Sequence, residues 1–280
     1  MKHFLLYINQ HKDPNRETAN RIQNYLVEKH QKCTVITKAD GTVWKEDEIP
    51  GDADCMIVLG GDGTMLRAAR DTKESQIPMI GVNVGTLGFM TEVEPENLEE
   101  ALDKLIRDEY ELECRMMLHG CIVKKSGEEL EDWALNDVTI SRSGSLKIVK
   151  LNIYVNGQLL CTYHADGMIV TTPTGSTGYN LSAGGPIVNP IAKLIMLTPI
   201  CAHTLNSRSI VLSAEDVVEI EIPLGRQGQV QQLEANFDGS NPVIMETGDR
   251  IRIFRSNKTT QIIKLGKASF LDVLHKKMSE

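Results

Sequence analysis

A glycine-rich motif with one aspartate, GGDGT at residues 60–64, follows the apolar run Cys55–Leu59 directly. A helix pattern begins next, so the motif forms a turn between a buried strand and a helix. Backbone N–H groups at such a helix start bind phosphate through hydrogen bonds and the helix dipole. The spacing matches neither the dinucleotide GxGxxG motif nor the P-loop. We predict a phosphate-binding turn at Gly61, Gly63 and Thr64 with Asp62 beside it; the alternative is a plain turn capped by Asp62 or Thr64.

A second polar stretch runs from Asp166 to Pro186, DGMIVTTPTGSTGYNLSAGGP. Its glycines and its Ser, Thr and Asn side chains exclude a regular strand throughout, and they offer many donors and acceptors to a polar ligand. Tyr179 adds a ring face on which a base could stack. The alternative is a polar surface loop, although such loops usually lack an embedded tyrosine and a flanking apolar strand.

Four weaker signals accompany these two motifs. Asn136-Asp137 precedes a strand and could bridge ribose hydroxyls, although alone such a pair is more often a turn. Asp238-Gly239 is typical of a hairpin turn. The glycine-spaced segment GVNVGTLGF at 81–89 could mark close backbone packing, and His203 is interpreted as a buried or turn histidine. No cluster of His, Cys and carboxylates indicates a structural metal.

The first half of the chain alternates strand and helix patterns, which predicts a parallel sheet covered on both faces. The expected strands are His3–Asn9, Cys33–Thr37, Cys55–Leu59 and Met79–Val84, and the expected helices are Arg16–Lys29, Thr64–Lys73 and Pro95–Arg107.

From about residue 111, short alternating segments separated by turn signals predict an antiparallel β domain. Ala192–Leu197 is the one place where a helix could intervene, and Ser269–Met278 is helical again. The expected strands are Gly120–Lys124, Asp137–Ser141, Ile148–Val155, Gln158–Tyr163, Met168–Thr172, Val217–Ile222 and Ile251–Arg255.

The composition fits an ordinary globular chain of one large or two smaller domains, with 280 residues, 41% hydrophobic and 24% charged. The 30 basic against 38 acidic residues give a net charge of −8, which argues against nucleic-acid binding. The N-terminal apolar run is too short for a secretory signal or a membrane span. The six cysteines show no metal spacing, and most are expected in the core, so a cytoplasmic protein without membrane contact is predicted.

Taken together, GGDGT at 60–64, LND at 135–137, DGMIVTTPTGSTGYNLSAGGPIV at 166–188 and TPICAHTLNSRSIVL at 198–212 resemble the NAD kinase family over nearly the whole chain. GGDGT alone is shared with diacylglycerol kinases and, in looser form, phosphofructokinases; the long TPTGST-Y stretch makes the resemblance specific. It implies an α/β plus all-β fold. An N-terminal parallel-sheet domain would cover 1–115, with the helix of 262–280 packing back on it, and a β-sandwich-like NAD-binding domain would cover 116–261.

The resemblance also implies a reaction and its partners. The γ-phosphoryl group of ATP, or of polyphosphate in some members, is transferred to the 2′-hydroxyl of the adenosine ribose of NAD. A divalent metal, Mg²⁺ or Mn²⁺, held mainly by the phosphates, assists, and members are commonly homodimers or homotetramers. Two other functions stay open: a lipid or sugar kinase of the same superfamily, and a nucleotide-sensing module without turnover.

Residue by residue, the resemblance assigns the proton acceptor to Asp62. His164 stands where many relatives have Arg, Gly178 where many have Ala, and Ser240 where many have Gln. The residues implied to bind substrate or nucleotide are Gly61, Gly63, Thr64, Asn136, Asp137, Lys147, His164, Asp166, Thr174, Thr177, Gly178, Tyr179, Asn180, Ser182 and Asp238.

Overall fold

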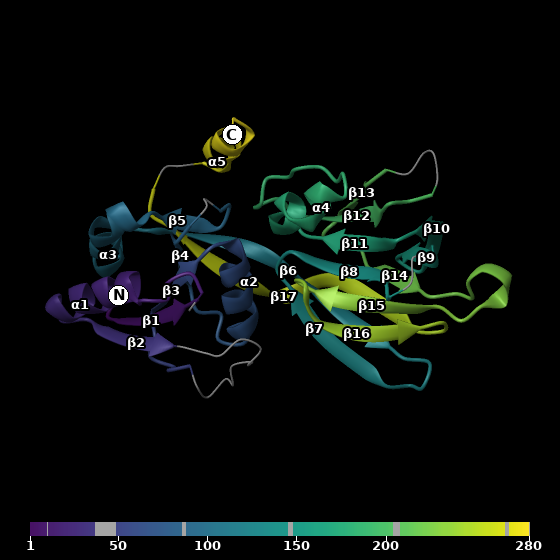
Figure 1. The fold of residues 1–280 in the computed structure, drawn as a ribbon, viewed down its shortest axis with the longest axis horizontal. Helices are drawn as coiled ribbons and strands as arrows, with labels where there is room; N and C mark the ends of the chain where they lie inside the picture. Colours follow the sequence, from purple (N-terminus) through teal and green to yellow (C-terminus); the bar gives the residue numbers. More distant parts are fainter. Residues whose placement is uncertain are drawn as a thin grey trace. The chain divides into compact units, whose positions relative to one another are not determined.

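Figure 1 shows the computed structural model of the chain, in which residues 1–9, 11–36, 49–85, 88–144, 148–203, 208–266 and 269–279 are described. The chain divides into two units, one formed by Met1–Arg115 with Lys258–Glu280 and the other by Met116–Asn257. Two long strands, β6 (Glu111–Val123) and β17 (Arg250–Lys264), cross these boundaries along the sequence.

The first unit is built on a parallel sheet in the order β2-β1-β3-β4, with β5 and the end of β17 beside β4. A short 3-10 turn, Pro95–Asn97, leads into α3. The remaining elements of this unit are β1 (His3–Ile8), α1 (Glu17–Glu28), β2 (Lys32–Ile36), β3 (Cys55–Gly60), α2 (Asp62–Asp71), β4 (Met79–Asn83), β5 (Thr91–Val93), α3 (Leu98–Ile106) and α5 (Phe270–Met278).

Both faces of this sheet are covered, as its continuous apolar strands require. Alternate residues of β1, β3 and β4 pack with α1 and α3 in one core, and those two helices lie side by side (Figure 1). The opposite face carries Tyr7, whose hydroxyl donates to Asp71 of α2 at 3.1 Å. At the C-terminal end of the chain, Ser269 and Asp272 form a capping box that starts α5.

The second unit consists mostly of antiparallel strands in two sheets. One sheet has the order β13-β12-β11-β8-β15-β16, and the other contains β10-β9-β14-β17 with β6 and β7. Its elements are β7 (Glu129–Ala134), β8 (Asp137–Arg142), β9 (Val149–Val155), β10 (Gln158–Ala165), β11 (Gly167–Thr171), the 3-10 turn Thr174–Thr177, α4 (Tyr179–Ser182), β12 (Leu194–Ile200), β13 (Ile210–Ser213), β14 (Val218–Glu221), the 3-10 turn Arg226–Gly228, β15 (Gln232–Phe237) and β16 (Ser240–Glu246).

One apolar core joins the two sheets of this unit. Its residues come from every second position of the strands, such as Val138 and Ile140 of β8 and Ile251 and Ile253 of β17. This is the sandwich that alternating segments produce when each strand buries one face. The predicted fold class, a parallel α/β part and a β-sandwich part, is therefore confirmed.

Three sequence-based expectations were wrong in detail. Ala192–Leu197 is not helical, because Leu194–Ile200 forms β12 between β11 and β13, and a short buried apolar run suits either element. The segment expected at Gly120–Lys124 belongs to the much longer β6. Most of the six cysteines were expected in the core, but Cys55 alone is fully buried; all six are described, and all are free.

Candidate active site

The GGDGT turn joins β3 to α2 as expected. At Gly60 a Cβ would lie 2.2 Å from Thr64 Oγ1, so glycine is needed for the strand to pass over this side chain. The Thr64 hydroxyl also accepts a hydrogen bond from Asn9 Nδ2 at 3.0 Å. These two contacts fix the start of α2 on the end of β3.

The Asp62 carboxylate does not cap its own helix. Its Oδ2 accepts the N–H of Phe89 at 2.8 Å, and its Oδ1 accepts the N–H of Met90 at 2.9 Å. A Cβ on Gly88 would lie 2.0 Å from Asp62 Oδ1, so only glycine leaves room for the carboxylate. Each carboxylate oxygen has two lone pairs, so the two bonds orient the group and still leave it able to accept a proton.

The backbone beside Asp62 is open. Among the described residues, nothing lies within 4 Å of the position that a Cβ would take on Gly61 or Gly63. The N–H groups of Thr64 and Met65 both donate to the carbonyl oxygen of Gly61, at 2.9 and 3.1 Å. The start of α2 thus has open space beside Gly61 and Gly63 at its positive end, where an anionic phosphate is favoured.

In the second unit, the segment Leu135–Asp137 is held by the carboxylate of Asp238. Asp238 Oδ2 accepts the Leu135 N–H at 2.8 Å, and Oδ1 accepts the N–H groups of Asn136 and Asp137 at 2.8 and 3.1 Å. Asp238 itself occupies the hairpin turn between β15 and β16, as predicted, with a left-handed φ of 51°. Burial, and secondarily the charge of Asp137, raise the pKa of Asp238 to about 7, against the lowering effect of the three N–H groups.

Two polar groups of this segment stand out. Asn136 Oδ1 is buried, with no hydrogen-bond partner among the described residues. Asp137 is 6% exposed, and its burial raises the pKa of the carboxyl to about 6, although the Thr139 hydroxyl donates to it at 3.1 Å. A buried acceptor without a donor is rare in folded proteins and points to a ligand.

The predicted polar stretch packs against the same segment. Thr171 Oγ1 donates to the carbonyl oxygen of Asn136 at 2.9 Å, and a Cβ on Gly178 would lie 3.4 Å from Asn136 Nδ2. Tyr179 is 47% exposed. The pKa of its hydroxyl is raised mainly by partial burial and, to a smaller extent, by the nearby Cys201, Asp137 and Asp166. The stretch therefore brings an accessible ring close to the Asn136-Asp137 pair.

Asn180 lies in this stretch but faces inward. It is fully buried, its Nδ2 donates to the carbonyl oxygens of Ser176 and Pro186, and its Oδ1 accepts the Thr198 hydroxyl at 2.7 Å. Its side chain is used to hold the loop. Thr174 is buried as well, Thr177 is half-buried and Ser182 is exposed.

Other predicted residues lie around β8 and β11. Asp166 forms an ion pair with Arg142, with 3.3 Å between Oδ1 and Nε. Arg142 was not among the residues predicted from the sequence. His164 is exposed on β10, and its carbonyl oxygen accepts the N–H of His203, which lies exposed in a bend. Lys147 lies outside the described residues. Ser240 closes the hairpin turn by donating to the carbonyl oxygen of Phe237 at 3.1 Å.

The structure thus gathers the predicted residues in two sets, one in each unit. The first holds Gly61, Asp62, Gly63 and Thr64; the second holds the described candidates from Asn136 to Asp238. No group of three or more His, Cys, Asp or Glu residues that could hold a metal ion occurs in the described ranges. Likewise, no helix in those ranges has the length and apolar run of a membrane span.

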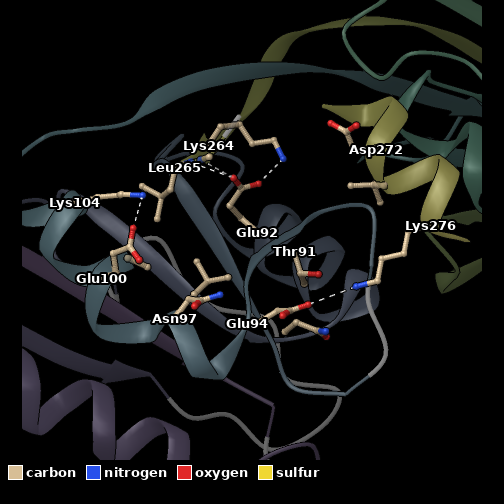
Figure 2. Close-up of a pocket in the computed structure, with 15 residues that line it drawn as sticks. Thr91, Glu92, Glu94, Asn97, Glu100, Lys104, Lys264, Leu265, Asp272 and Lys276 are labelled. Atoms are coloured by element: carbon tan, nitrogen blue, oxygen red, sulfur yellow. Dashed lines mark hydrogen bonds and ion pairs between the residues drawn. The ribbon is translucent and has the colours of Figure 1, made fainter. Parts of the chain in front are cut away.

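A cavity of about 440 Å³ in the first unit contains none of the predicted residues. It is lined by β5, α3, the end of β17 and α5 (Figure 2). Six of its seven charged side chains form ion pairs: Figure 2 shows Glu92–Lys264, Glu100–Lys104 and Glu94–Lys276, at 2.6, 2.9 and 3.8 Å, while Asp272 accepts bonds from Ser269 in the capping box of α5. Because these charges are paired, the cavity offers little to an ionic ligand.

Comparison with known proteins gives consistent matches. A family model described as the ATP-NAD kinase N-terminal domain matches residues 14–110, and one described as the ATP-NAD kinase C-terminal domain matches residues 135–265. A protein named NAD kinase from Agathobacter rectalis is 46% identical, and the match covers 99% of this chain and 99% of that protein. A protein named NAD kinase from Lachnospira eligens is 42% identical, and the match covers 99% of this chain and all of that protein.

Two solved structures are also similar. An NAD kinase from Archaeoglobus fulgidus in complex with ATP is 26% identical, with a TM-score of 0.80 and full coverage of both chains. Yeast NADH kinase complexed with NADH shares the fold at 24% identity, with a TM-score of 0.85 over 99% of this chain and 88% of that one.

Proposed function

This chain belongs to the NAD kinase family, and on that premise we propose that it transfers the γ-phosphoryl group of ATP to the 2′-hydroxyl of the adenosine ribose of NAD, giving NADP and ADP. The observation that carries the proposal is the Asp62 carboxylate, held by the N–H groups of Phe89 and Met90 beside the open backbone that begins α2. A fixed acceptor next to a phosphate-binding turn is what phosphoryl transfer to a hydroxyl requires.

The proposed role of Asp62 is to accept the proton of the 2′-hydroxyl. As that O–H bond breaks, the ribose oxygen forms a bond to the γ-phosphorus, and the bond from the γ-phosphorus to the bridging oxygen of ADP breaks. The proton remains on Asp62 until solvent removes it. The N–H groups around Gly61 and Gly63 would stabilise phosphate charge during the transfer, together with the positive end of α2.

We propose Mg²⁺ or Mn²⁺ as the divalent metal of the reaction. The described residues contain no cluster of three ligands, and both Asp62 oxygens accept N–H bonds. This donor set does not form a protein-only site; it fits a metal that arrives on the ATP phosphates, as Mg²⁺ commonly does. When bound, the metal would neutralise phosphate charge.

NAD is assigned to the second unit. Asn136 and Asp137 are proposed to bind the nicotinamide ribose and base region of NAD, and the accessible Tyr179 ring is proposed to stack on a base. The half-buried pair of Arg142 and Asp166 would complete the site. The remaining proposed ligand-binding residues are Lys147, His164, Asp166, Thr174, Thr177, Gly178, Ser182 and Asp238, and Asn180 is proposed to support them by holding the loop.

Four further properties are proposed with this function. The functional domains are 1–115 with 262–280, and 116–261. A homodimer or homotetramer is supported by exposed apolar side chains in the second unit, among them Leu159, Ile191 and Val211. A cytoplasmic location fits the six free thiols, and polyphosphate is proposed as a second donor.

The test is direct. Purified protein is incubated with NAD, ATP and Mg²⁺, and NADP is quantified with an NADP-specific dehydrogenase, with reactions lacking ATP or NAD as controls. We expect NADP to accumulate in proportion to enzyme and time. A folded protein that binds NAD without forming NADP would instead indicate a nucleotide-sensing module. Phosphorylation of diacylglycerol or a sugar without NADP formation would indicate another kinase of the superfamily.

A further inference from the structure

The backbone from Leu135 to Asp137 has an unusual number of fixed partners. Its three N–H groups all donate to the single carboxylate of Asp238. Its carbonyl oxygens accept bonds from the Thr172 hydroxyl at 2.6 Å, from the Thr171 hydroxyl and the Thr172 N–H at 2.9 and 2.8 Å, and from the Asp238 N–H at 3.0 Å. Every backbone polar group of the segment is therefore satisfied by other strands.

The side chains on this segment are the ones left for a ligand. Asn136 Oδ1 is buried without a partner among the described residues, and Asp137 Oδ1 accepts the Thr139 hydroxyl at 3.1 Å. Fixing the backbone on both sides sets where these two side chains point. A change in the anchor would therefore move the acceptors without touching the ligand itself.

We propose that Asp238 is a positioning residue for NAD: its carboxylate fixes the peptide groups of Leu135–Asp137 and thereby places the Asn136 and Asp137 side chains for the dinucleotide. The inference rests on the proposed function and changes the role given to Asp238 itself. All three bonds recorded for its carboxylate go to backbone N–H groups of Leu135–Asp137, so the role we assign to it is to hold this segment.

The turn allows a clean substitution. Asp238 has φ 51°, a left-handed conformation that Asn adopts as readily as Asp, so Asp238→Asn leaves the hairpin intact. The carboxylate accepts three N–H groups through two oxygens, whereas an amide has one acceptor oxygen and an NH₂ group. In either orientation of the amide, at least one backbone N–H then faces another donor, and the segment must shift.

Asp249 provides a matched control in the same unit. It is 4% exposed, and its carboxylate accepts the N–H groups of Lys125 and Glu246 at 2.8 and 2.9 Å and pairs with Lys124 Nζ at 3.3 Å; none of these is a predicted site residue. Asp249→Asn therefore removes the same kind of bond at a place with no role in NAD binding. A purely structural function of Asp238 would make the two variants behave alike.

The experiment measures the KM for NAD, the KM for ATP and the thermal midpoint of the wild type and both variants. We expect Asp238→Asn to raise the KM for NAD about tenfold, the size of one lost bond to a charged group, and to leave the KM for ATP within about twofold. Asp249→Asn should lower the midpoint similarly and leave both KM values within about twofold. An unchanged KM for NAD in Asp238→Asn, or equal KM changes in both variants, would overturn the proposal.

Two further measurements keep the inference separate from the proposed function. Calorimetric titration with NAD reports the Kd whether or not NADP is formed, so a protein without turnover still tests the anchor. If Asp238→Asn does not fold, Asp238→Glu is used, which keeps the charge and moves the carboxylate by one methylene. It should weaken NAD binding as well, and wild-type affinity in a folded Asp238→Glu would contradict the anchor.

Discussion

Gly88 determines whether the Asp62 carboxylate can occupy its observed position. In Gly88→Ala the new Cβ would start 2.0 Å from Asp62 Oδ1 and 2.7 Å from Cγ. The oxygen would have to retreat by about 1.4 Å to reach an ordinary van der Waals distance. That movement breaks the bonds from the N–H groups of Phe89 and Met90, now 2.8 and 2.9 Å. Moving the Asp62 carboxylate by this distance should lower the rate of phosphoryl transfer about 100-fold. Losing two charge-assisted bonds of ~1.5 kcal/mol each corresponds to a loss of the same size.

The assay is the kcat of NADP formation at saturating NAD and ATP, with folding checked by circular dichroism. Gly51→Ala is the control, because a Cβ there meets nothing within 4 Å among the described residues of the same unit. We expect Gly88→Ala to lose about 100-fold in kcat and Gly51→Ala to stay within about twofold. A folded Gly88→Ala enzyme with wild-type kcat would refute the reasoning that glycine preserves the position of Asp62.

Two further predictions concern stability. Burial raises the pKa of Asp137 in the folded chain to about 6, whereas the unfolded chain releases this proton near pH 4. Between these two pH values the folded chain holds a proton that the unfolded chain has lost. The free energy of unfolding therefore falls by about 1.4 kcal/mol per unit as the pH rises from 4 to 6. Asp137→Asn should make the fall in the free energy of unfolding between pH 4 and 6 shallower by about 1.4 kcal/mol per unit and leave the part due to Asp238, whose pKa is also raised; an unchanged slope would exclude Asp137 as a source. Glu92→Gln should lower the free energy of unfolding in urea by about 2 kcal/mol, because Glu92 is nearly buried and pairs with Lys264 at 2.6 Å (Figure 2). Glu74→Gln, at an exposed pair with Lys258, should cost less than about 1 kcal/mol, and equal losses would argue against a special role for Glu92.

Much of the first unit could be predicted from the sequence. Continuous apolar runs between helix patterns located β1, β3 and β4, and the GGDGT spacing located the turn and Asp62. The partners of Asp62 could not be predicted, because they are backbone N–H groups 27 and 28 residues away, and no side-chain pattern marks a backbone donor. The available signal was the glycine spacing of segment 81–89, which indicated that close backbone packing could occur there but not that Gly88 makes room for Asp62.

The second unit shows the same limit. The hairpin turn at Asp238-Gly239 was predicted correctly from a local rule, since this dipeptide accepts left-handed backbone. Its carboxylate, however, reaches Leu135–Asp137, more than 100 residues earlier in the chain. Local propensity carries no information about such a pairing, which depends on β15 and β8 lying beside each other in the sheet.

Strand β12 was missed for a different reason. Its sequence, LIMLTPI, is buried almost throughout, so neither the alternation of a half-exposed strand nor the stripe of an amphipathic helix is visible. Only its pairing with β11 and β13 decides the conformation. The pairing of Arg142 with Asp166 could not be predicted from the sequence. Asp166 directly precedes β11, which lies beside the strand of Arg142, β8, although the two residues are separated in the chain.

The proton-acceptor role of Asp62 is tested most directly by Asp62→Asn, measured for both NAD binding and NADP formation. Asparagine keeps the size of the side chain and cannot take the proton of the 2′-hydroxyl, and its NH₂ group replaces one of the two oxygens that accept the N–H groups of Phe89 and Met90. We predict that the Kd for NAD stays within about threefold, while kcat falls by at least about 100-fold, the usual contribution of a general base. A folded Asp62→Asn protein that forms NADP at the wild-type rate would contradict the account.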